Sequence, residues 1–281
     1  MLTVLDVLHK ATDYLAKKEV ESPRLNAEHL LAHCLGMKRL EIYLAFDRPV
    51  KESELTAMRE MIRTRGERIP LQHLLGNVEF FGRKFLSDSR ALIPRPETEQ
   101  LLEILLEKIK KEEPPQSLRC LDVGTGSGVI AITLALELPE SEIIATDISP
   151  AALELAQKNA SLFEIKNPIR FLEADIAPAD SSPFSVIAAN LPYIAESEMA
   201  TLQPEVLHDP REALCGGIAG TEIIEKLIAL AQEKLLTAGG ILALEMGEGQ
   251  PSLLKPILQN WHSCEILHDY QGKERFLFAK K

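Results

Sequence analysis

From residue 94 onward, short apolar runs of strand length alternate with longer segments that have the spacing of amphipathic helices. This alternation predicts a parallel sheet with helices on both faces, because a parallel strand needs a crossover connection to reach its neighbour. The predicted strands are residues 118–123, 142–147, 169–174, 184–190 and 240–246, and the predicted helices are residues 97–111, 128–138, 150–162 and 221–236.

The end of the chain departs from this alternation. Residues 264–270 and 275–279 read as two strands joined by Gln271-Gly272-Lys273, which predicts a tight antiparallel hairpin. The expected fold is therefore α/β, with a Rossmann-like sheet of seven strands that ends in an antiparallel hairpin. That combination is typical of class I methyltransferases.

The beginning of the chain has a different pattern. Residues 1–74 read as a small bundle of four amphipathic helices: one begins after Thr3, one runs from Ser22-Pro23 to Gly36, and two more lie near residues 39–46 and 52–69. Short apolar runs then alternate with glycine turns, which predicts a β-hairpin linker. The predicted domains are residues 1–74 (helical, for substrate recognition), 75–92 (hairpin linker) and 93–281 (methyltransferase).

Composition excludes several classes of protein. The 281 residues are 46% hydrophobic and 26% charged, as in globular proteins, and no apolar stretch predicts a signal peptide or a membrane span. Residues 1–74 hold 12 Lys and Arg against 11 Asp and Glu, whereas the remainder holds 19 against 31. An acidic catalytic portion disfavours direct binding of nucleic acid.

Cysteine and histidine positions predict neither disulfides nor a metal site. The four cysteines are far apart and form no C-x-x-C pair, which fits a reducing, cytoplasmic setting. His29 and His33 lie one helical turn apart, but Glu28 precedes the first histidine, so the zinc-protease pattern is absent. No metal is therefore expected.

A glycine-rich turn follows the first predicted strand and opens a helix. Glycines in this position allow a sharp backbone turn and a close approach of a ligand to main-chain atoms. The predicted cofactor-binding residues of this turn are Asp122, Gly124, Thr125, Gly126, Ser127 and Gly128.

The charge of Asp122 indicates the kind of cofactor. A dinucleotide would place an anionic pyrophosphate at this helix N-terminus, and a carboxylate two residues before the first glycine would repel it. S-adenosylmethionine carries an ammonium and a sulfonium group, for which an aspartate is a suitable partner. The sequence therefore predicts S-adenosylmethionine as the cofactor.

Two further strand ends add candidate cofactor ligands. Asp147 ends the second strand, 19 residues after Gly128, where an acidic residue usually accepts hydrogen bonds from ribose hydroxyls. At the end of the third strand, Asp175 is expected to accept the adenine amino proton and Ile176 to cover the adenine ring.

The fourth strand leads into Asn190-Leu191-Pro192-Tyr193, where ligands bind in open α/β sheets. A planar NH2 nitrogen is a poor nucleophile, because its lone pair is delocalised. The Asn190 side-chain oxygen and the Leu191 carbonyl would accept its two hydrogens and hold it in line with the methyl group. Pro192 would fix the turn and Tyr193 would stack on the flat group. These four residues are the predicted catalytic residues, with Asn190 also beside the cofactor.

With these motifs in view, almost the whole chain resembles the PrmC (HemK) family of peptide-chain release factor glutamine methyltransferases. The resemblance implies an enzyme that methylates the side-chain nitrogen of the glutamine in the Gly-Gly-Gln loop of class-1 release factors. We expect the chain to be a monomer. The resemblance is carried by the helical N-terminal domain, Pro70-Leu71-Gln72, Glu79-Phe80-Phe81-Gly82, Leu92-Ile93-Pro94-Arg95-Pro96-Glu97-Thr98-Glu99, the glycine turn, Asn190–Tyr193, Asp209-Pro210-Arg211-Glu212-Ala213-Leu214 and Gly216-Gly217.

One departure from the family pattern leaves the acceptor open. The family usually has Asn-Pro-Pro-Tyr, whereas Leu191 stands here at the second position, as in ribosomal RNA adenine dimethyltransferases. The motif by itself therefore does not decide between an amide acceptor and an adenine acceptor in rRNA or DNA. A glutamine of a ribosomal protein is a third possible acceptor, and a non-catalytic cofactor-sensing role also stays open.

Overall fold

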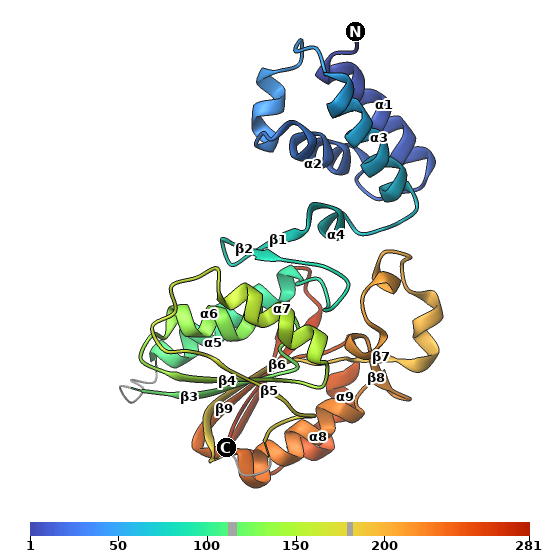
Figure 1. Cartoon of the computed structure of the whole chain (residues 1–281). Coiled ribbons are helices and arrows are strands. Elements are labelled where there is room, and N and C mark those ends of the chain that lie inside the picture. Colours follow the sequence, from blue (N-terminus) through green and yellow to red (C-terminus); the bar gives the residue numbers. More distant parts are fainter. Residues whose placement is uncertain (112–116, 179–181) are drawn as a thin grey trace. The chain divides into compact units, whose positions relative to one another are not determined.

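The computed structural model describes residues 1–111, 117–178 and 182–281. They form two units: Met1–Asn77 with Gln203–His208, and Val78–Leu202 with Asp209–Lys281 (Figure 1). None of the helices in the described ranges has both the length and the apolar character that crossing a membrane requires.

The first unit is a small helical bundle. Thr3 begins its first helix with a capping box, because its Oγ1 accepts a hydrogen bond from the Asp6 amide and its own amide donates to the Asp6 carboxylate. Valine, leucine and isoleucine side chains from several helices form one buried core. The elements are α1 (Val4–Lys17), α2 (Pro23–Leu35), η1 (Arg39–Leu44), α3 (Glu52–Gly66), α4 (Leu71–Leu75) and η3 (Val206–His208).

Details of this bundle differ from the prediction. Ser22 has a φ of 48° and its side chain caps nothing, so Pro23 alone marks the start of α2. Residues 39–44 form a 3-10 helix, and α3 ends at Gly66. The one-turn helix α4 was not predicted.

A segment distant in sequence belongs to the same unit. The Glu205 carboxylate accepts hydrogen bonds from Arg65 Nη2 at 2.8 Å and from Arg68 Nε and Nη2 at 2.7 and 2.6 Å. Although burial alone would raise it, these hydrogen bonds lower the pKa of Glu205 to about 2. The two arginines thereby anchor residues 203–208 in the helical unit.

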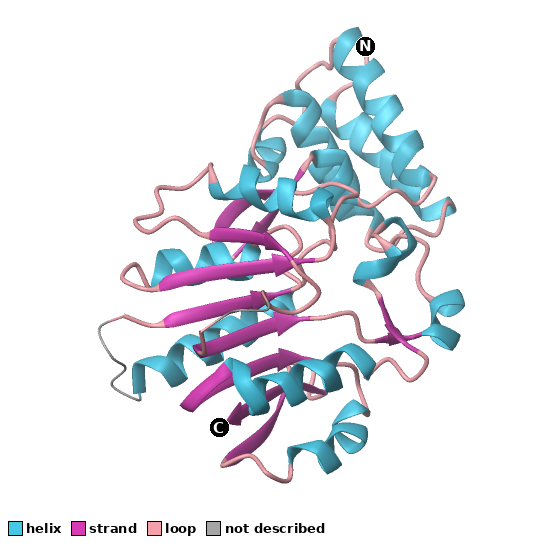
Figure 2. Ribbon diagram, turned by 60° about the horizontal axis from the view of Figure 1, so that its bottom comes forward, coloured by secondary structure: helices cyan, strands magenta, loops and turns pink. Residues whose placement is uncertain are grey.

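The second unit is built on a sheet of seven strands, as predicted (Figure 2). Five strands are parallel, and the C-terminal hairpin inserts β11 antiparallel between β9 and β10. The order is β10-β11-β9-β6-β3-β4-β5. The strands are β3 (Arg119–Val123), β4 (Glu142–Asp147), β5 (Arg170–Glu173), β6 (Phe184–Asn190), β9 (Leu236–Glu245), β10 (Ser263–His268) and β11 (Glu274–Lys280).

Helices cover both faces of this sheet (Figure 2). Successive strand residues point to opposite faces, so Cys120 packs with one set of helices and Leu121 with the other. The first face holds α5 (Pro96–Lys111) and α6 (Val129–Glu137), and the second holds α8 (Glu222–Leu230), the π-helical turn η5 (Ala231–Leu235) and α9 (Gln250–Leu254). Helix α7 (Pro150–Ala160) packs beside β4 and β5.

Two small sheets accompany the large one. The predicted hairpin is present as β1 (Asn77–Phe80) and β2 (Arg83–Leu86). The parallel pair β7 (Ile194–Ala195) and β8 (Cys215–Gly217) was not predicted, because two- and three-residue strands carry no periodicity. This pair brings the chain back beside the carboxyl end of β6.

Candidate functional site

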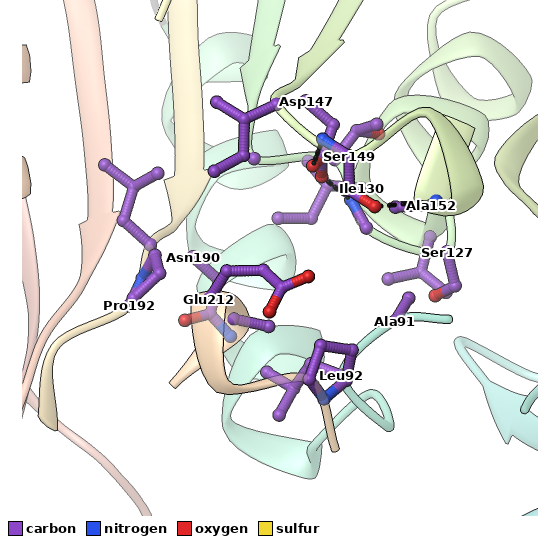
Figure 3. A pocket seen from close by; sticks show the side chains of 18 of the residues that line it. Ala91, Leu92, Ser127, Ile130, Asp147, Ser149, Ala152, Asn190, Pro192 and Glu212 are labelled. Atoms are coloured by element: carbon purple, nitrogen blue, oxygen red, sulfur yellow. Dashed lines mark hydrogen bonds between the residues drawn. The ribbon is translucent and has the colours of Figure 1, made fainter. Parts of the chain in front are cut away.

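A pocket lies at the carboxyl ends of β3, β4 and β6, within the second unit (Figure 3). Its empty volume, including the open mouth, is about 930 Å³. Its walls come from the glycine turn after β3, residues 147–149 after β4, residues 190–192 after β6, the loop 90–94, and residues 210–213 with the 3-10 helix η4 (Arg211–Ala213).

The glycine turn needs glycine for two separate reasons. Gly124, Gly126 and Gly128 have φ values of +68°, +54° and +85°, in the left-handed region. A Cβ atom at Gly128 would also lie 3.0 Å from the Ala156 Cβ and 3.1 Å from the Ile132 Cδ1. The turn therefore exposes main-chain atoms to the pocket while α6 packs closely on α7.

Asp122 lies beneath this turn and does not line the pocket. It is fully buried, and its Oδ2 accepts hydrogen bonds from Thr125 Oγ1 at 2.6 Å and from the Ala131 amide at 3.0 Å. Burial raises the pKa of Asp122 to about 7. Asp122 was expected to contact the cofactor directly, whereas the structure places its carboxyl group under the turn, where it ties the turn to the first residues of α6.

Asp147 does line the pocket, at the end of β4 (Figure 3). Its Oδ2 accepts a hydrogen bond from the Gly126 amide at 2.8 Å, and its Oδ1 accepts one from the Ser149 amide at 2.9 Å. Burial raises the pKa of this carboxyl group. Ser149 caps α7 by accepting a hydrogen bond from the Ala152 amide.

The two residues expected beside adenine are separated. Asp175 lines the pocket and forms an ion pair with Lys226, with side chains 64% and 52% exposed. Ile176 was expected to cover the adenine ring, but it is buried in the core beneath and does not line the pocket. Ile148 is the apolar side chain at that wall, and it is 54% exposed. Ile148 lies in the sequence between Asp147, which ends β4, and Ser149, which caps α7. This position at a strand end was the signal from which its place at the pocket could have been predicted.

The turn after β6 contributes three residues to the pocket: Asn190, Leu191 and Pro192. Asn190 Nδ2 donates a hydrogen bond to Thr98 Oγ1 at 2.9 Å. Leu191 is buried against the glycine turn, since a Cβ atom at Gly124 would lie 3.0 Å from the Leu191 Cδ2. The predicted catalytic turn and the predicted glycine turn thus meet at one pocket.

Tyr193 is placed differently from these three residues. It does not line the pocket, and its hydroxyl group donates a hydrogen bond to Glu245 Oε1 at 3.3 Å. Its carbonyl group accepts from Gln250 Nε2 at 2.7 Å. The expected stacking of Tyr193 on an acceptor is therefore not supported by a position in this pocket.

Several residues of the site were missed by the sequence analysis. Thr98 lies in the first turn of α5 and lines the pocket, and buried Glu245 lies behind it. Glu212 projects into the pocket from η4 (Figure 3). Arg95 Nη2 donates to Asp209 Oδ2 at 3.2 Å beside this helix. The segment around residues 95–99 was singled out in the sequence, but its pattern did not show which side chain would face the site.

The charge of the pocket suits a cationic ligand. Its lining includes the carboxylates of Asp147, Asp175 and Glu212. Among the described residues that line it, Arg90 is the only cation, and Arg90 donates to the Asp88 carboxylate at 2.9 and 2.7 Å. A pyrophosphate would meet net negative charge here, whereas an ammonium or sulfonium group would be stabilised.

Two family models match the chain. Residues 6–76 match the PrmC N-terminal domain, and residues 98–218 match the methyltransferase small domain. The release factor glutamine methyltransferase of Chlorobaculum tepidum is 40% identical over 98% of this chain and 96% of its own length. The protein of the same name from Deinococcus radiodurans is 39% identical over 98% of both chains.

Solved structures with low identity share the fold. The hMettl16 catalytic domain, in complex with the MAT2A 3'UTR hairpin 6, is 17% identical, with a TM-score of 0.58 over 79% of this chain and 82% of that one. The T. thermophilus 16S rRNA methyltransferase RsmC, in complex with AdoMet and guanosine, is 18% identical, with a TM-score of 0.52 over 73% and 49%.

Proposed function

Because the chain belongs to the family of release factor glutamine methyltransferases, we propose that it transfers a methyl group from S-adenosylmethionine to a glutamine side-chain nitrogen. The acceptor is the glutamine of the Gly-Gly-Gln loop in class-1 release factors. The observation that carries the proposal is the pocket that joins the glycine turn to Asn190, Leu191 and Pro192.

The cofactor side of the pocket fits S-adenosylmethionine. The main chain of residues 124–127 would hold the methionyl part, and Asp147 would accept hydrogen bonds from the ribose hydroxyls. Ile148 would contact the adenine ring, and Asp175 would accept a hydrogen bond from the adenine amino group. Asp122 supports the turn from below, through Thr125 and Ala131. The bound cofactor supplies a methyl group on a cationic sulfur, which the acidic lining favours.

The acceptor side holds the target amide by its two hydrogens. The Asn190 Oδ1 and the Leu191 carbonyl oxygen accept them, and this keeps the nitrogen in line with the methyl group while positive charge develops on it. No general base is needed, because the methylated nitrogen becomes acidic and loses its proton to water. Leu191 acts through its main chain, so a leucine serves where relatives in the family usually have proline.

We also propose how the chain recognises its substrate, in which oligomeric state it works and where it acts. Residues 1–74 recognise the release factor, and the chain works as a monomer in the cytoplasm without direct contact to nucleic acid. Light scattering of the purified protein tests the oligomeric state. Binding of the purified protein to labelled RNA at physiological salt tests the last point, and tight binding would reject it.

The direct test is incubation with methyl-labelled S-adenosylmethionine and a purified class-1 release factor, followed by mass spectrometry of the modified peptide. One methyl group on the glutamine of the Gly-Gly-Gln loop is expected. A release factor with that glutamine replaced by alanine is the matched control and should remain unlabelled. Label in ribosomal RNA or in a ribosomal protein, with none in the release factor, would reject the proposed substrate.

A further inference from the structure

A line of hydrogen bonds runs from the pocket into the protein behind Asn190. Asn190 Nδ2 donates to Thr98 Oγ1 at 2.9 Å, and Thr98 Oγ1 donates to Glu245 Oε2 at 2.7 Å. The Tyr193 hydroxyl group donates to the other carboxylate oxygen at 3.3 Å. Thr98 and Glu245 are each only 2% exposed, so water does not replace these partners.

The number of hydrogens on each group determines which group donates and which accepts in these hydrogen bonds. An ionised carboxylate accepts hydrogen bonds and donates none, so Thr98 must give its single hydroxyl proton to Glu245. The Thr98 oxygen can then only accept from Asn190, which must present its NH2 group to it. The carbonyl end of the Asn190 amide consequently faces away from Thr98.

We propose that Thr98 and Glu245 are positioning residues, which lock the Asn190 amide with its oxygen toward the acceptor nitrogen. This role rests on the proposed function. A flipped Asn190 amide would turn its own N–H groups toward the NH2 group of the substrate, and two sets of hydrogen-bond donors cannot bond to each other. This set of hydrogen bonds between Asn190, Thr98 and Glu245, called the lock below, therefore favours a substrate nitrogen that carries hydrogens. It should affect kcat rather than the affinity for the cofactor.

The fold brings the three residues together from distant parts of the chain. Asn190 is the register partner of Glu245 on the neighbouring strands β6 and β9. Thr98 enters from the first turn of α5, where its amide donates to the Arg95 carbonyl group. The hydroxyl group of Thr98 thus connects the first turn of α5 to Asn190 in the turn after β6.

The charge state of Glu245 determines whether the lock holds. Burial raises the pKa of Glu245 to about 7; the Arg275 guanidinium lowers it, the Glu97 carboxylate raises it, and the hydrogen bonds of Thr98 and Tyr193 lower it. A protonated Glu245 can donate to Thr98, which frees the Thr98 proton for the Asn190 oxygen. Turnover should therefore fall as the pH drops through about 7.

Three variants test the lock with the full-length protein and a purified release factor. Thr98→Val keeps the shape and removes the hydroxyl group, Thr98→Ser restores that group, and Thr133→Val removes a buried hydroxyl group of α6 that has no partner among the described residues. Thr98→Val should lower kcat by about 10- to 100-fold, with the cofactor Kd changed by less than about three-fold. Thr98→Ser should recover most of kcat, and Thr133→Val should retain it.

Glu245→Gln provides a second measurement in case Thr98→Val fails to fold. Its glutamine is neutral at every pH, so the fall of kcat below about pH 7 should disappear and the plateau should be lower than in the wild type. Equal kcat values for Thr98→Val and Thr98→Ser, or a wild-type pH profile in Glu245→Gln, would overturn the positioning role alone. A wild-type protein that leaves the release factor unmodified would instead reject the proposed function, and the positioning role with it.

Discussion

The two sides of the pocket are built in different ways. The cofactor side is made of a main-chain turn and of side chains that bond to neighbouring segments, as Asp147 does with the amides of Gly126 and Ser149. The acceptor side depends on Asn190, whose partner Thr98 lies 92 positions earlier in the chain. The first side is shaped by local backbone geometry, and the second by side chains that only the finished fold brings together.

The largest expected effect separates these two sides. Asn190→Ala removes the acceptor for one amide hydrogen but leaves the glycine turn intact, so kcat should fall by roughly 10²- to 10³-fold. The cofactor Kd should change by less than about three-fold. Single-turnover kinetics together with calorimetric titration of the cofactor measure both quantities. Equal losses in kcat and in cofactor affinity would show that the two sides are not separable.

The cofactor side should be more sensitive to backbone changes. Gly128→Ala puts a Cβ atom 3.0 Å from the Ala156 Cβ at a φ of +85°. The combined cost of the left-handed conformation and the overpacking is about 2–4 kcal/mol of unfolding free energy. Chemical denaturation monitors this change.

Gly272→Ala is the matched control, because Gly272 has a φ of +82° and nothing lies within 4 Å of its added Cβ atom. It should cost only the conformational part, about 1 kcal/mol. If both variants lost the same stability, close packing of α6 on α7 would not be the reason for a glycine at position 128.

A third comparison stays within the cofactor side. Asp147→Ala removes the proposed ribose acceptor and the bond to the Gly126 amide, so the cofactor Kd should rise by about 10- to 50-fold. Asp175→Ala should raise it by less than about five-fold, because the Asp175 side chain is 64% exposed and already paired with Lys226. Fluorescence titration with the cofactor ranks the two, and a reversed order would contradict the assigned positions.

The contrast between the two sides also explains what the sequence could predict. The seven-stranded sheet follows from the period of its apolar residues, and the glycine turn follows from the backbone conformations that only glycine adopts readily. Asp147 and Asn190 were found because ligands bind at strand ends in such sheets.

The sequence could not show which side chains point into the pocket and which point into the core. Ile176 follows a strand end as Ile148 does, yet it points into the core, and local pattern does not distinguish the two. Glu245 reads as one more residue of β9, and its link to Thr98 requires a register and a helix placement that no local spacing encodes.

The smallest expected effect concerns Asp122, which ties the turn to α6 from below. Asp122→Asn keeps the size and an acceptor oxygen, so the cofactor Kd should change by less than about three-fold. A direct ion pair with the cofactor would instead make the loss of affinity at least about ten-fold. Calorimetric titration of the cofactor distinguishes the two results.

Stability gives an independent check on the same variant. Because burial raises the pKa of Asp122 to about 7, the folded state binds its proton more tightly than the unfolded state. The wild type therefore loses stability as the pH rises from about 4 to about 7. Asp122→Asn has no such proton to lose. The unfolding free energy of the variant minus that of the wild type should therefore increase between about pH 4 and about pH 7 and remain constant above about pH 7.

Glu245 and Asp209 have raised pKa values of about 7 and about 6 and are present in both proteins, so the difference in unfolding free energy at each pH isolates Asp122. A pH-independent difference combined with a large loss of cofactor affinity would place Asp122 in contact with the cofactor after all.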